Sequence, residues 1–574
     1  MKGLTPDSRS DVSVVLCGQA GQGIQTVEKL LTRILCAAGC NVFATKEYMS
    51  RVRGGANSTE IRVSASPVRA YIDRIDILIP LNKGAIEHVA DRISPETIVL
   101  AEEETVSANA GKLSNVINVP FTKIAAGIGS AVYSNVVATG TLAAIFGVEL
   151  QTVVDYVKQN FSAKSPEIIG NNVEATKAGF KIGAELRASG RIKIAGTFTA
   201  GVKNDIFLNG GEAVALGAIA GGCNFIAAYP MSPSTPVLVF LAQHAGEFGI
   251  IAEQAEDEIA GMNMAIGAWY AGGRALASTS GGGFALMIEG LSLAGMLESP
   301  VVVHLAQRPG PATGLPTRTE QADLELALYA GHGEFPRIIY APGKLEDAFY
   351  LTQKAFNLAD KFQVPVFVLT DQYLIDSYYN TPPFDLSGVK VEKHIIKTNK
   401  DYIRYALTEN GISPRGIPGY GEGLVVVDSD EHDQEGHITE DLQLRTRMVD
   451  KRLKKLELIK KEIEPPELWP AQDYKKLVVC WGSTYDVVKE AILRLKRKDV
   501  SLLHYNQVYP LHPETAGFLK KAETVVIVEN NATSQFGKLI KLYAGIDIDK
   551  KILKYNGLSF SVEEVADGLK KILD

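Results

Sequence analysis

The sequence predicts an α/β protein built of three α/β units, and three observations support this class. The chain has 574 residues, too long for a single hydrophobic core, which indicates about two to four domains. Its hydrophobic content of 46% and its 53 glycines are typical of a globular α/β protein. Short apolar segments alternate with helical ones, which favours mainly parallel sheets with helices on both faces.

The first predicted unit covers residues 1–185. It begins with a strand, a glycine loop and an amphipathic helix in DVSVVLCGQAGQGIQTVEKLLTRILCAAG. The loop glycines Gly18, Gly21 and Gly23 follow the order G-x-x-G-x-G instead of the dinucleotide-binding order G-x-G-x-x-G. This order argues against nucleotide binding, although free N–H groups at a helix N-terminus can still attract an anionic group.

Two arginines, Arg51 and Arg53, precede a Gly–Gly turn in SRVRGGANSTEIRVS. They fit either a hairpin with solvated arginines or a basic rim that meets phosphates or a partner subunit. The sequence alone leaves both interpretations open.

A polar linker is predicted at 186–204, and the second unit at 205–400. This unit is richer in glycine than the first. Its candidate strands alternate with helical stretches, as in a mainly parallel sheet. The strands are FIAAYP, IIAE, RALASTS, VVVHLA, RIIYAP and VPVFVLTD.

A bridging segment is predicted at 401–474, and the third α/β unit at 475–574, beginning with KKLVVCWGS. The bridge contains the charged segment LQLRTRMVDKRLKKLELIKKEI. Its spacing predicts a helix with one packing stripe at Leu453, Leu456 and Ile463.

Composition and charge exclude several classes of protein. A net charge of −7 argues against a nucleic-acid surface, which needs a basic face. No apolar run reaches the roughly 18 residues that cross a bilayer, and MKGLTPDSRSDVSV lacks the apolar segment of a secretory signal. The five cysteines are scattered and form no C-x-x-C pair. We therefore predict a cytoplasmic chain with reduced thiols and no iron–sulfur cluster of its own, since such clusters generally take four ligands.

The segment FIAAYPMSPSTPVL, residues 225–238, combines an apolar strand with three prolines. Proline fixes φ and donates no backbone hydrogen bond, so the strand must end here. A stiff loop before a helix is one explanation. The other is that the hydroxyls of Ser232, Ser234 and Thr235 are held still because a ligand binds there.

Glu258 follows several acidic residues in AEQAEDEIAGMNMAIGAWYAGG. Acidic residues are favourable in a first helical turn through the helix dipole, which explains two or three of them. Glu258, however, leads directly into an almost entirely apolar helix. A carboxyl group in such surroundings is expected to be desolvated and suited to hold or share a proton.

Arg308 is predicted at the C-terminal end of the strand VVVHLA, in the segment HLAQRPGPATGLPTRTEQAD. Parallel sheets bind ligands at this end of their strands. A Gly/Pro loop with Thr313 and Thr317 follows. Arginine is the natural bidentate partner of a carboxylate, so an anionic substrate is predicted.

Together, AYPMSPSTP, AEDEIAGMNMAIGAWYAGGRALASTSGGG and QRPGPATGLPTRTEQADL resemble the α subunit of the 2-oxoacid:ferredoxin oxidoreductases. These are thiamine-diphosphate enzymes that form acyl-CoA and pass electrons to ferredoxin. The resemblance extends over nearly the whole chain. It implies a γ-like domain at 1–185, a thiamine-diphosphate pyrimidine-binding domain at 205–400 and a transketolase-C-like domain at 475–574. Such γ–α fusions commonly act on 2-oxoglutarate or on a range of 2-oxoacids.

The resemblance implies a catalytic and cofactor-binding role for Glu258. It matches the glutamate that exchanges a proton with N1′ of the cofactor's aminopyrimidine. Tyr229 and Pro230, at the end of the preceding strand, are expected to bind the cofactor as well.

The resemblance also implies three substrate-binding residues. Arg308 and Thr317 match the arginine and threonine that bind the 2-oxoacid. Ser232 stands where the family usually has threonine, and Met231 replaces the usual isoleucine. The hydroxyl is retained, so a bond to the substrate is still expected.

The chain lacks the G-D-G sequence with which thiamine enzymes hold magnesium and the diphosphate. The resemblance therefore implies a β subunit that carries the diphosphate site, Mg²⁺ and a [4Fe–4S] cluster. No residue of this chain is expected to bind metal. CoA is implied as co-substrate, ferredoxin as electron acceptor, and a dimer of αβ heterodimers as the assembly.

Two other functions remain open from the sequence: a transketolase-like or decarboxylating thiamine subunit without electron transfer, and a non-catalytic scaffold. The segment DSDEHDQEGHITED, residues 428–441, gathers His432, His437 and several carboxylates. Its spacing fits no familiar zinc signature, and a solvated acidic loop is predicted.

Overall fold

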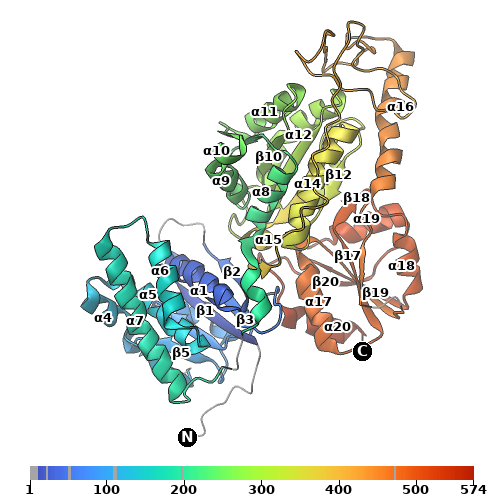
Figure 1. Ribbon diagram of the computed structural model, residues 1–574. Helices are drawn as coiled ribbons and strands as arrows, with labels where there is room; N and C mark the ends of the chain where they lie inside the picture. The colour runs from blue at the N-terminus through green and yellow to red at the C-terminus, as the bar shows by residue number, and fades with distance from the viewer. Residues whose placement is uncertain are drawn as a thin grey trace. The chain divides into compact units, whose positions relative to one another are not determined.

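The computed structural model describes residues 11–20, 23–49, 54–107, 113–194, 198–470 and 473–573. Arg51, Arg53 and Gly21 lie outside the described residues. Contacts divide the chain into two compact units. The N-terminal unit is Met1–Leu208 with Asp376–Phe384, and the C-terminal unit is Asn209–Ile375 with Asp385–Asp574. Strands alternate with helices in both units, which confirms the α/β prediction (Figure 1).

The N-terminal unit contains an eight-stranded mixed sheet in its described residues, in the order β6-β5-β4-β1-β3-β2-β14-β7. β1 pairs in parallel with β4 and antiparallel with β3, so the sheet changes direction at its centre. The strands are β1 (Asp11–Ala20), β2 (Asn41–Glu47), β3 (Gly54–Ser64), β4 (Ile77–Pro80), β5 (Ile98–Ala101), β6 (Asn115–Asn118), β7 (Ile206–Asn209) and β14 (Tyr378–Thr381).

Helices α1 (Ile24–Ala38), α5 (Ser134–Phe146), α6 (Leu150–Asn160) and α7 (Pro166–Ala188) pack together in this unit (Figure 1). Glycines allow α5 and α7 to approach closely. A Cβ placed on Gly179 would lie 2.0 Å from the carbonyl oxygen of Val137, and one on Gly140 would lie 2.3 Å from that of Thr176. Larger residues at these glycines would force the two helices apart.

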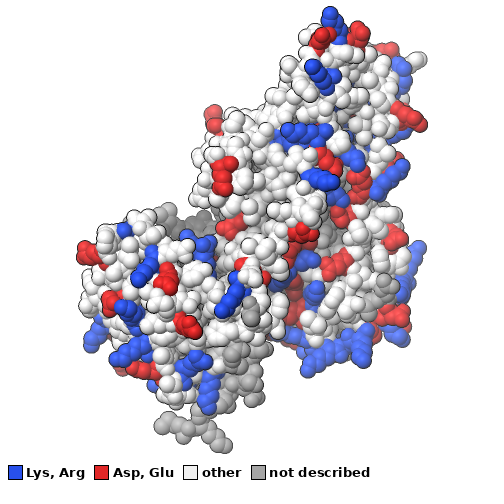
Figure 2. Space-filling model, viewed as in Figure 1, with Lys and Arg blue, Asp and Glu red and all other residues white. Residues whose placement is uncertain are grey.

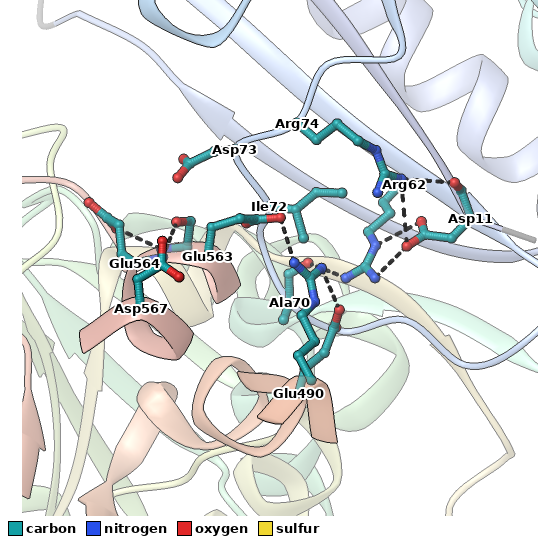
Figure 3. Close-up of polar contacts among 12 residues, drawn as sticks. Asp11, Arg62, Ala70, Ile72, Asp73, Arg74, Glu490, Glu563, Glu564 and Asp567 are labelled. Carbon is teal, nitrogen blue, oxygen red and sulfur yellow. Dashed lines mark hydrogen bonds and ion pairs between the residues drawn. The ribbon is translucent and has the colours of Figure 1, made fainter. Parts of the chain in front are cut away.

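A buried arginine fixes the start of the central strand. Arg62 on β3 donates hydrogen bonds to both carboxylate oxygens of Asp11, at 2.9 and 2.6 Å, and to the carbonyl oxygen of Ala70 at 2.9 Å. Arg74 donates to the backbone oxygen of Asp11 at 2.9 Å. Figure 3 shows both guanidinium groups directed at Asp11.

The C-terminal unit contains a seven-stranded sheet among its described residues, in the order β18-β12-β13-β11-β10-β8-β9. Every pairing is parallel except that of β12 with β18, which confirms the mainly parallel sheet. The strands are β8 (Phe225–Ala228), β9 (Ile251–Gln254), β10 (Ala275–Thr279), β11 (Val301–Gln307), β12 (Ile338–Tyr340), β13 (Pro365–Asp371) and β18 (Gln507–Tyr509).

The helices of this sheet follow its strands. α8 (Gly210–Ala220) packs on α14 (Leu345–Phe362), and α11 (Glu258–Tyr270) packs on α12 (Gly281–Met296), as Figure 1 shows. The others are α9 (Thr235–Gln243), α10 (Ala245–Phe248), α13 (Leu324–Tyr329) and α15 (Gln372–Asp376).

A five-stranded sheet in the order β15-β17-β16-β19-β20 completes the described part of this unit. The chain leaves β17 and enters β18, which joins the seven-stranded sheet, so the two sheets are directly connected. The elements are β15 (Glu467–Trp469), β16 (Lys476–Trp481), α17 (Tyr485–Leu495), β17 (Val500–Tyr505), α18 (Thr515–Lys521), β19 (Thr524–Glu529), α19 (Gln535–Ala544), β20 (Lys550–Leu553) and α20 (Val562–Leu573).

The charged segment forms helix α16 (Leu442–Ile459), but the predicted packing stripe is wrong. Leu453 and Leu456 are only half-buried, and Ile463 lies beyond the helix. The buried face consists instead of Met448, Lys451, Arg452, Lys455 and Ile459.

Lys451 and Lys455 are buried because they share one carboxylate. Their Nζ atoms lie 2.5 and 2.6 Å from the two carboxylate oxygens of Glu298, which is 1% exposed. Burial alone would raise the pKa of Glu298, but Lys455 and Lys451 hold it well below its usual range. A buried charge cluster therefore replaces the expected apolar contact.

No helix in the described ranges is long and apolar enough to cross a membrane.

Candidate functional site

The proline-rich corner lies between β8 and α9. The Ser234 side chain is 2% exposed, and its hydroxyl donates to the carbonyl oxygen of Met231 at 2.7 Å. This hydroxyl therefore stabilises the turn itself. The hydroxyl of Ser232 is half-buried and makes no hydrogen bond within the described part of the chain, so it can bind a ligand.

Arg308 follows β11 directly, at the carboxyl end of the sheet where it was predicted. It is 8% exposed, and its Nη1 donates to the carbonyl oxygen of Ser232 at 2.7 Å. The fold thus brings these two predicted residues together, but through the backbone of Ser232. The buried Nε of Arg308 has no hydrogen-bond partner among the described residues.

Glu258 is the first residue of α11 and is only 3% exposed, as its apolar surroundings predict. The neighbouring Asp257 caps this helix by accepting a hydrogen bond from the backbone N–H of Ala260 at 2.8 Å. Glu258 is therefore not needed as a cap. Its Oε1 is buried and has no hydrogen-bond partner in the described structure, a costly state unless a ligand group meets it.

The glycines that begin α12 make room for two carboxyl groups. A Cβ placed on Gly283 would lie 2.5 Å from Oε1 of Glu258, and one on Gly281 would lie 2.4 Å from Oδ2 of Asp323. Both carboxyls thus lie against the start of this helix, where N–H groups have no intrahelical partner. The glycine run in STSGGG is the sequence signal for this close approach.

Asp323 is a site residue that the sequence analysis did not identify. Its Oδ2 is buried and unpaired in the described structure, and its backbone N–H donates to Oε1 of Gln307 at 3.0 Å. Burial and, to a smaller extent, the charge of Glu320 raise the pKa of Asp323, Arg308 lowers it, and the net result is a pKa of about 7. Near neutral pH, this carboxyl group therefore changes its charge close to Arg308.

The electrostatics of Arg308 link it to both carboxyl groups. Burial lowers the pKa of Arg308, while the negative charges of Asp323 and Glu258 raise it. An arginine remains a cation under such a shift, since its ordinary pKa exceeds about 12. The site therefore holds one fixed cation between two acidic groups.

The remaining predicted residues lie at the edges of this cluster. Thr317 is 9% exposed on the loop between β11 and α13, and within the described residues its hydroxyl does not bond to Ser232, Glu258 or Arg308. Tyr229 is 41% exposed, and Pro230 is half-buried, both just after β8.

The arrangement fits a cofactor whose ring nitrogen meets a carboxyl group. Glu258 presents an unpaired oxygen, and Arg308 an unpaired N–H, from neighbouring elements of one buried region. A buried carboxyl can exchange a proton with a basic nitrogen, and a buried guanidinium can bind a carboxylate. These are the two functions that the sequence assigned to them.

The two histidines of the acidic segment 428–441 lie in different surroundings. His432 is fully buried, its Nδ1 lies 3.0 Å from the carbonyl oxygen of Asp430, and its ring packs on Tyr405 at 3.9 Å. His437 is exposed. Within the ranges that the structure describes, no group of three or more His, Cys, Asp or Glu side chains could hold a metal ion.

Comparisons with known proteins identify the family to which the chain is similar. Residues 216–451 match the family described as "Pyruvate flavodoxin/ferredoxin oxidoreductase, thiamine diP-bdg", and residues 13–182 match "Pyruvate ferredoxin/flavodoxin oxidoreductase". The chain is 32% identical to a 2-oxoacid:ferredoxin oxidoreductase subunit alpha from Sulfolobus sp, over 98% of this chain and 97% of that one. It is 27% identical to the 2-oxoglutarate oxidoreductase subunit KorA of Mycobacterium tuberculosis, over 99% and 93% of the two chains.

A solved structure is similar over the full length. The 2-oxoglutarate:ferredoxin oxidoreductase from Magnetococcus marinus, determined with 2-oxoglutarate, coenzyme A and succinyl-CoA bound, matches with a TM-score of 0.90 and 29% identity. The match covers 99% of this chain and 100% of the other.

Proposed function

Since this chain belongs to the family of 2-oxoacid:ferredoxin oxidoreductase α subunits, we propose that it oxidatively decarboxylates 2-oxoglutarate together with a β subunit. The 2-oxoacid and CoA are converted to acyl-CoA, carbon dioxide, a proton and two electrons, which ferredoxin accepts. The observation that supports this function best is the pair formed by Glu258 and Arg308, each buried with one unpaired polar atom.

The proposal of 2-oxoglutarate as substrate rests on the names of two similar proteins. The relatives from Mycobacterium tuberculosis and Magnetococcus marinus both carry it in their names, and the latter was determined with 2-oxoglutarate and succinyl-CoA bound. CoA is accordingly the proposed co-substrate.

Each residue of the site has a proposed role. Thiamine diphosphate, when bound, supplies the chemistry that breaks the bond to the substrate carboxylate. Glu258 holds and returns a proton at a ring nitrogen of this cofactor, beside Tyr229 and Pro230. Arg308 binds the C1 carboxylate of the 2-oxoacid, and the hydroxyls of Ser232 and Thr317 orient it.

A β subunit is proposed to complete the site. This chain has no G-D-G sequence, and its five cysteines are all buried and scattered. The β subunit would therefore supply the diphosphate site, Mg²⁺ and the [4Fe–4S] cluster, in a dimer of αβ heterodimers.

The surface beside the site supports such a partner. Large apolar side chains are exposed on successive elements from α9 to α12, and Figure 2 shows few charged groups over α9–α11. Exposed apolar patches of this kind mark protein interfaces. The side chains are Val239, Phe248, Ile251, Ile259, Met264 and Leu286.

The reaction itself is tested with the αβ complex and thiamine diphosphate. Incubation with CoA, viologen dye and either 2-oxoglutarate or pyruvate is expected to yield succinyl-CoA and two reduced dye equivalents per turnover, with 2-oxoglutarate preferred. A product formed without dye reduction would favour a non-redox thiamine enzyme. A preference for pyruvate would overturn the proposed substrate.

Arg308→Lys is expected to lower kcat/KM by roughly ten- to a hundredfold, since lysine keeps the charge but loses the planar fork. The loss should be similar for every 2-oxoacid, because all share the C1 carboxylate. Thiamine-diphosphate affinity should hardly change. Steady-state kinetics on two 2-oxoacids measure the loss in kcat/KM, and titration with thiamine diphosphate measures the cofactor affinity.

Arg337→Lys is the matched control. Arg337 is 6% exposed, and its Nη1 donates to one carbonyl oxygen, that of Ala327, at 2.9 Å. If both variants lowered only the melting temperature and left kcat/KM intact, Arg308 would have a structural role alone.

Asp323→Asn is expected to remove a pH dependence of substrate binding. As pH rises through about 7, Asp323 loses its proton and competes with the substrate carboxylate for Arg308, so the KM of the wild type should increase. The amide cannot ionise, so the KM of the variant should stay low between pH 6 and 8. An unchanged KM profile in the variant would contradict this role.

A further inference from the structure

The loop between β11 and α13, from Arg308 to Asp323, contains three of the site residues and no regular helix or strand. Loops of this kind are usually mobile, yet a binding site needs its groups held in place. Arg308 and Asp323, at its two ends, are bonded to Ser232 and Gln307, and the Thr319 hydroxyl accepts from the backbone N–H of Tyr373. A further set of contacts comes from the distant sequence 481–557. We term Arg308–Asp323 the site loop.

Gln321 is the centre of these contacts. It is 0% exposed, and its backbone N–H donates to the carbonyl oxygen of Asn530 at 2.7 Å, while the N–H of Asn530 donates to Oε1 of Gln321 at 3.0 Å. Nε2 of Gln321 donates to the carbonyl oxygen of Trp481 at 2.9 Å. Nδ2 of Asn531 donates to the carbonyl oxygen of Gln321 at 3.0 Å. Both backbone groups and both side-chain groups of Gln321 are thus bound by one region.

Further contacts flank this residue. Nε2 of Gln535 donates to the carbonyl oxygen of Ala322 at 2.7 Å, and the backbone N–H of Thr319 donates to the carbonyl oxygen of Gly557 at 3.1 Å. Asn531 and Gln535 are almost fully buried, so water competes little for these bonds.

We propose that Gln321 is a positioning residue, through which the five-stranded sheet holds the site loop in its substrate-binding conformation. The inference rests on the proposed function, because it assumes that Arg308 and Thr317 bind the 2-oxoacid. All hydrogen-bonding groups of Gln321 are taken by protein partners, so its proposed role does not include a bond to substrate or cofactor. It fixes the backbone two residues before Asp323 and four residues after Thr317. The five-stranded sheet thereby contributes to substrate binding without supplying a group to the site.

The test compares Gln321→Ala with Thr515→Val in the αβ complex. Gln321→Ala removes two side-chain hydrogen bonds, to Asn530 and Trp481. Thr515→Val also removes two, to Tyr505 and His512, but away from the site loop. Both should lower the melting temperature. Only Gln321→Ala should raise the KM for 2-oxoglutarate, by about ten- to a hundredfold, the order expected for a misplaced site.

Gln535→Ala provides a milder variant if Gln321→Ala does not assemble. It removes the bonds of the Gln535 side chain to the carbonyl oxygen of Ala322 and to the backbone N–H of Glu325, and leaves Gln321 in place. It should raise the same KM several-fold, with thiamine-diphosphate affinity unchanged. Equal KM values in the wild type, in Gln321→Ala and in Gln535→Ala would overturn the positioning role. That outcome differs from failure of the proposed function, in which the wild-type complex itself would show no turnover of any 2-oxoacid.

Discussion

Glu258→Gln is expected to keep the fold and the subunit association but to lower kcat by roughly a hundred- to ten-thousandfold, the usual contribution of general acid–base catalysis. The amide is isosteric with the carboxyl group, so the space left by Gly283 still accommodates it. It cannot, however, give and take a proton at the cofactor ring. The KM for 2-oxoglutarate should change little, because Arg308 and not Glu258 binds the substrate. Steady-state kinetics and a thermal melt of the same complex measure both effects.

Glu256→Gln is the matched control for this prediction. Glu256 lies two residues earlier and is exposed to solvent, so the same change in charge occurs close to the site without entering it. Its activity should remain close to that of the wild type. If Glu258→Gln retained activity within a few-fold of the wild type, Glu258 would have no part in the proton transfer.

The isolated chain is expected to bind thiamine diphosphate weakly. It is also expected to turn over no substrate, which is a complete loss of activity relative to the αβ complex. Its residues meet only the pyrimidine side of the proposed cofactor site, since the chain has no G-D-G sequence for Mg²⁺ and the diphosphate. Electrons would also have no acceptor, because the five buried cysteines show no cluster pattern. Calorimetric titration with thiamine diphosphate and Mg²⁺ measures the first effect. Tight binding by the isolated chain would show that the diphosphate site lies here.

The sequence predicts the α/β class and most strands of the C-terminal unit because apolar runs bounded by turns are local signals. The strand VVVHLA, for example, became β11 with Arg308 at its end. Glu258 could also be found in this way, since the loss of polar neighbours after it is visible in the sequence. Its burial at 3% exposure confirms that expectation.

Other features depend on contacts between distant segments and have no local signal. The sequence places Lys451 and Lys455 on a solvated helix face, and their ion pairs with Glu298 explain why they are buried. β14 returns to the N-terminal sheet from a segment predicted to belong to the second unit. The domain boundaries themselves remain a prediction.

Asp323 was missed for a similar reason. At the end of TRTEQAD it looks like an ordinary residue before a helix, and its importance comes from Gly281 on another element and from Arg308 at the other end of the same loop. The role of Gln321 has no local signal either, because its hydrogen-bond partners follow it by about two hundred residues in the sequence. Such pairings follow from the tertiary fold and not from local sequence periodicity.

The most direct test of the account is dye reduction by the separate and the mixed subunits. This chain, its β subunit and their equimolar mixture are each supplied with 2-oxoglutarate, CoA, thiamine diphosphate and Mg²⁺, and the reduction of methyl viologen is followed. The account predicts reduction by the mixture alone, with activity that saturates at one α chain per β chain. Turnover by this chain without its partner, or none by the mixture, would contradict the claim that it supplies one half of a shared active site.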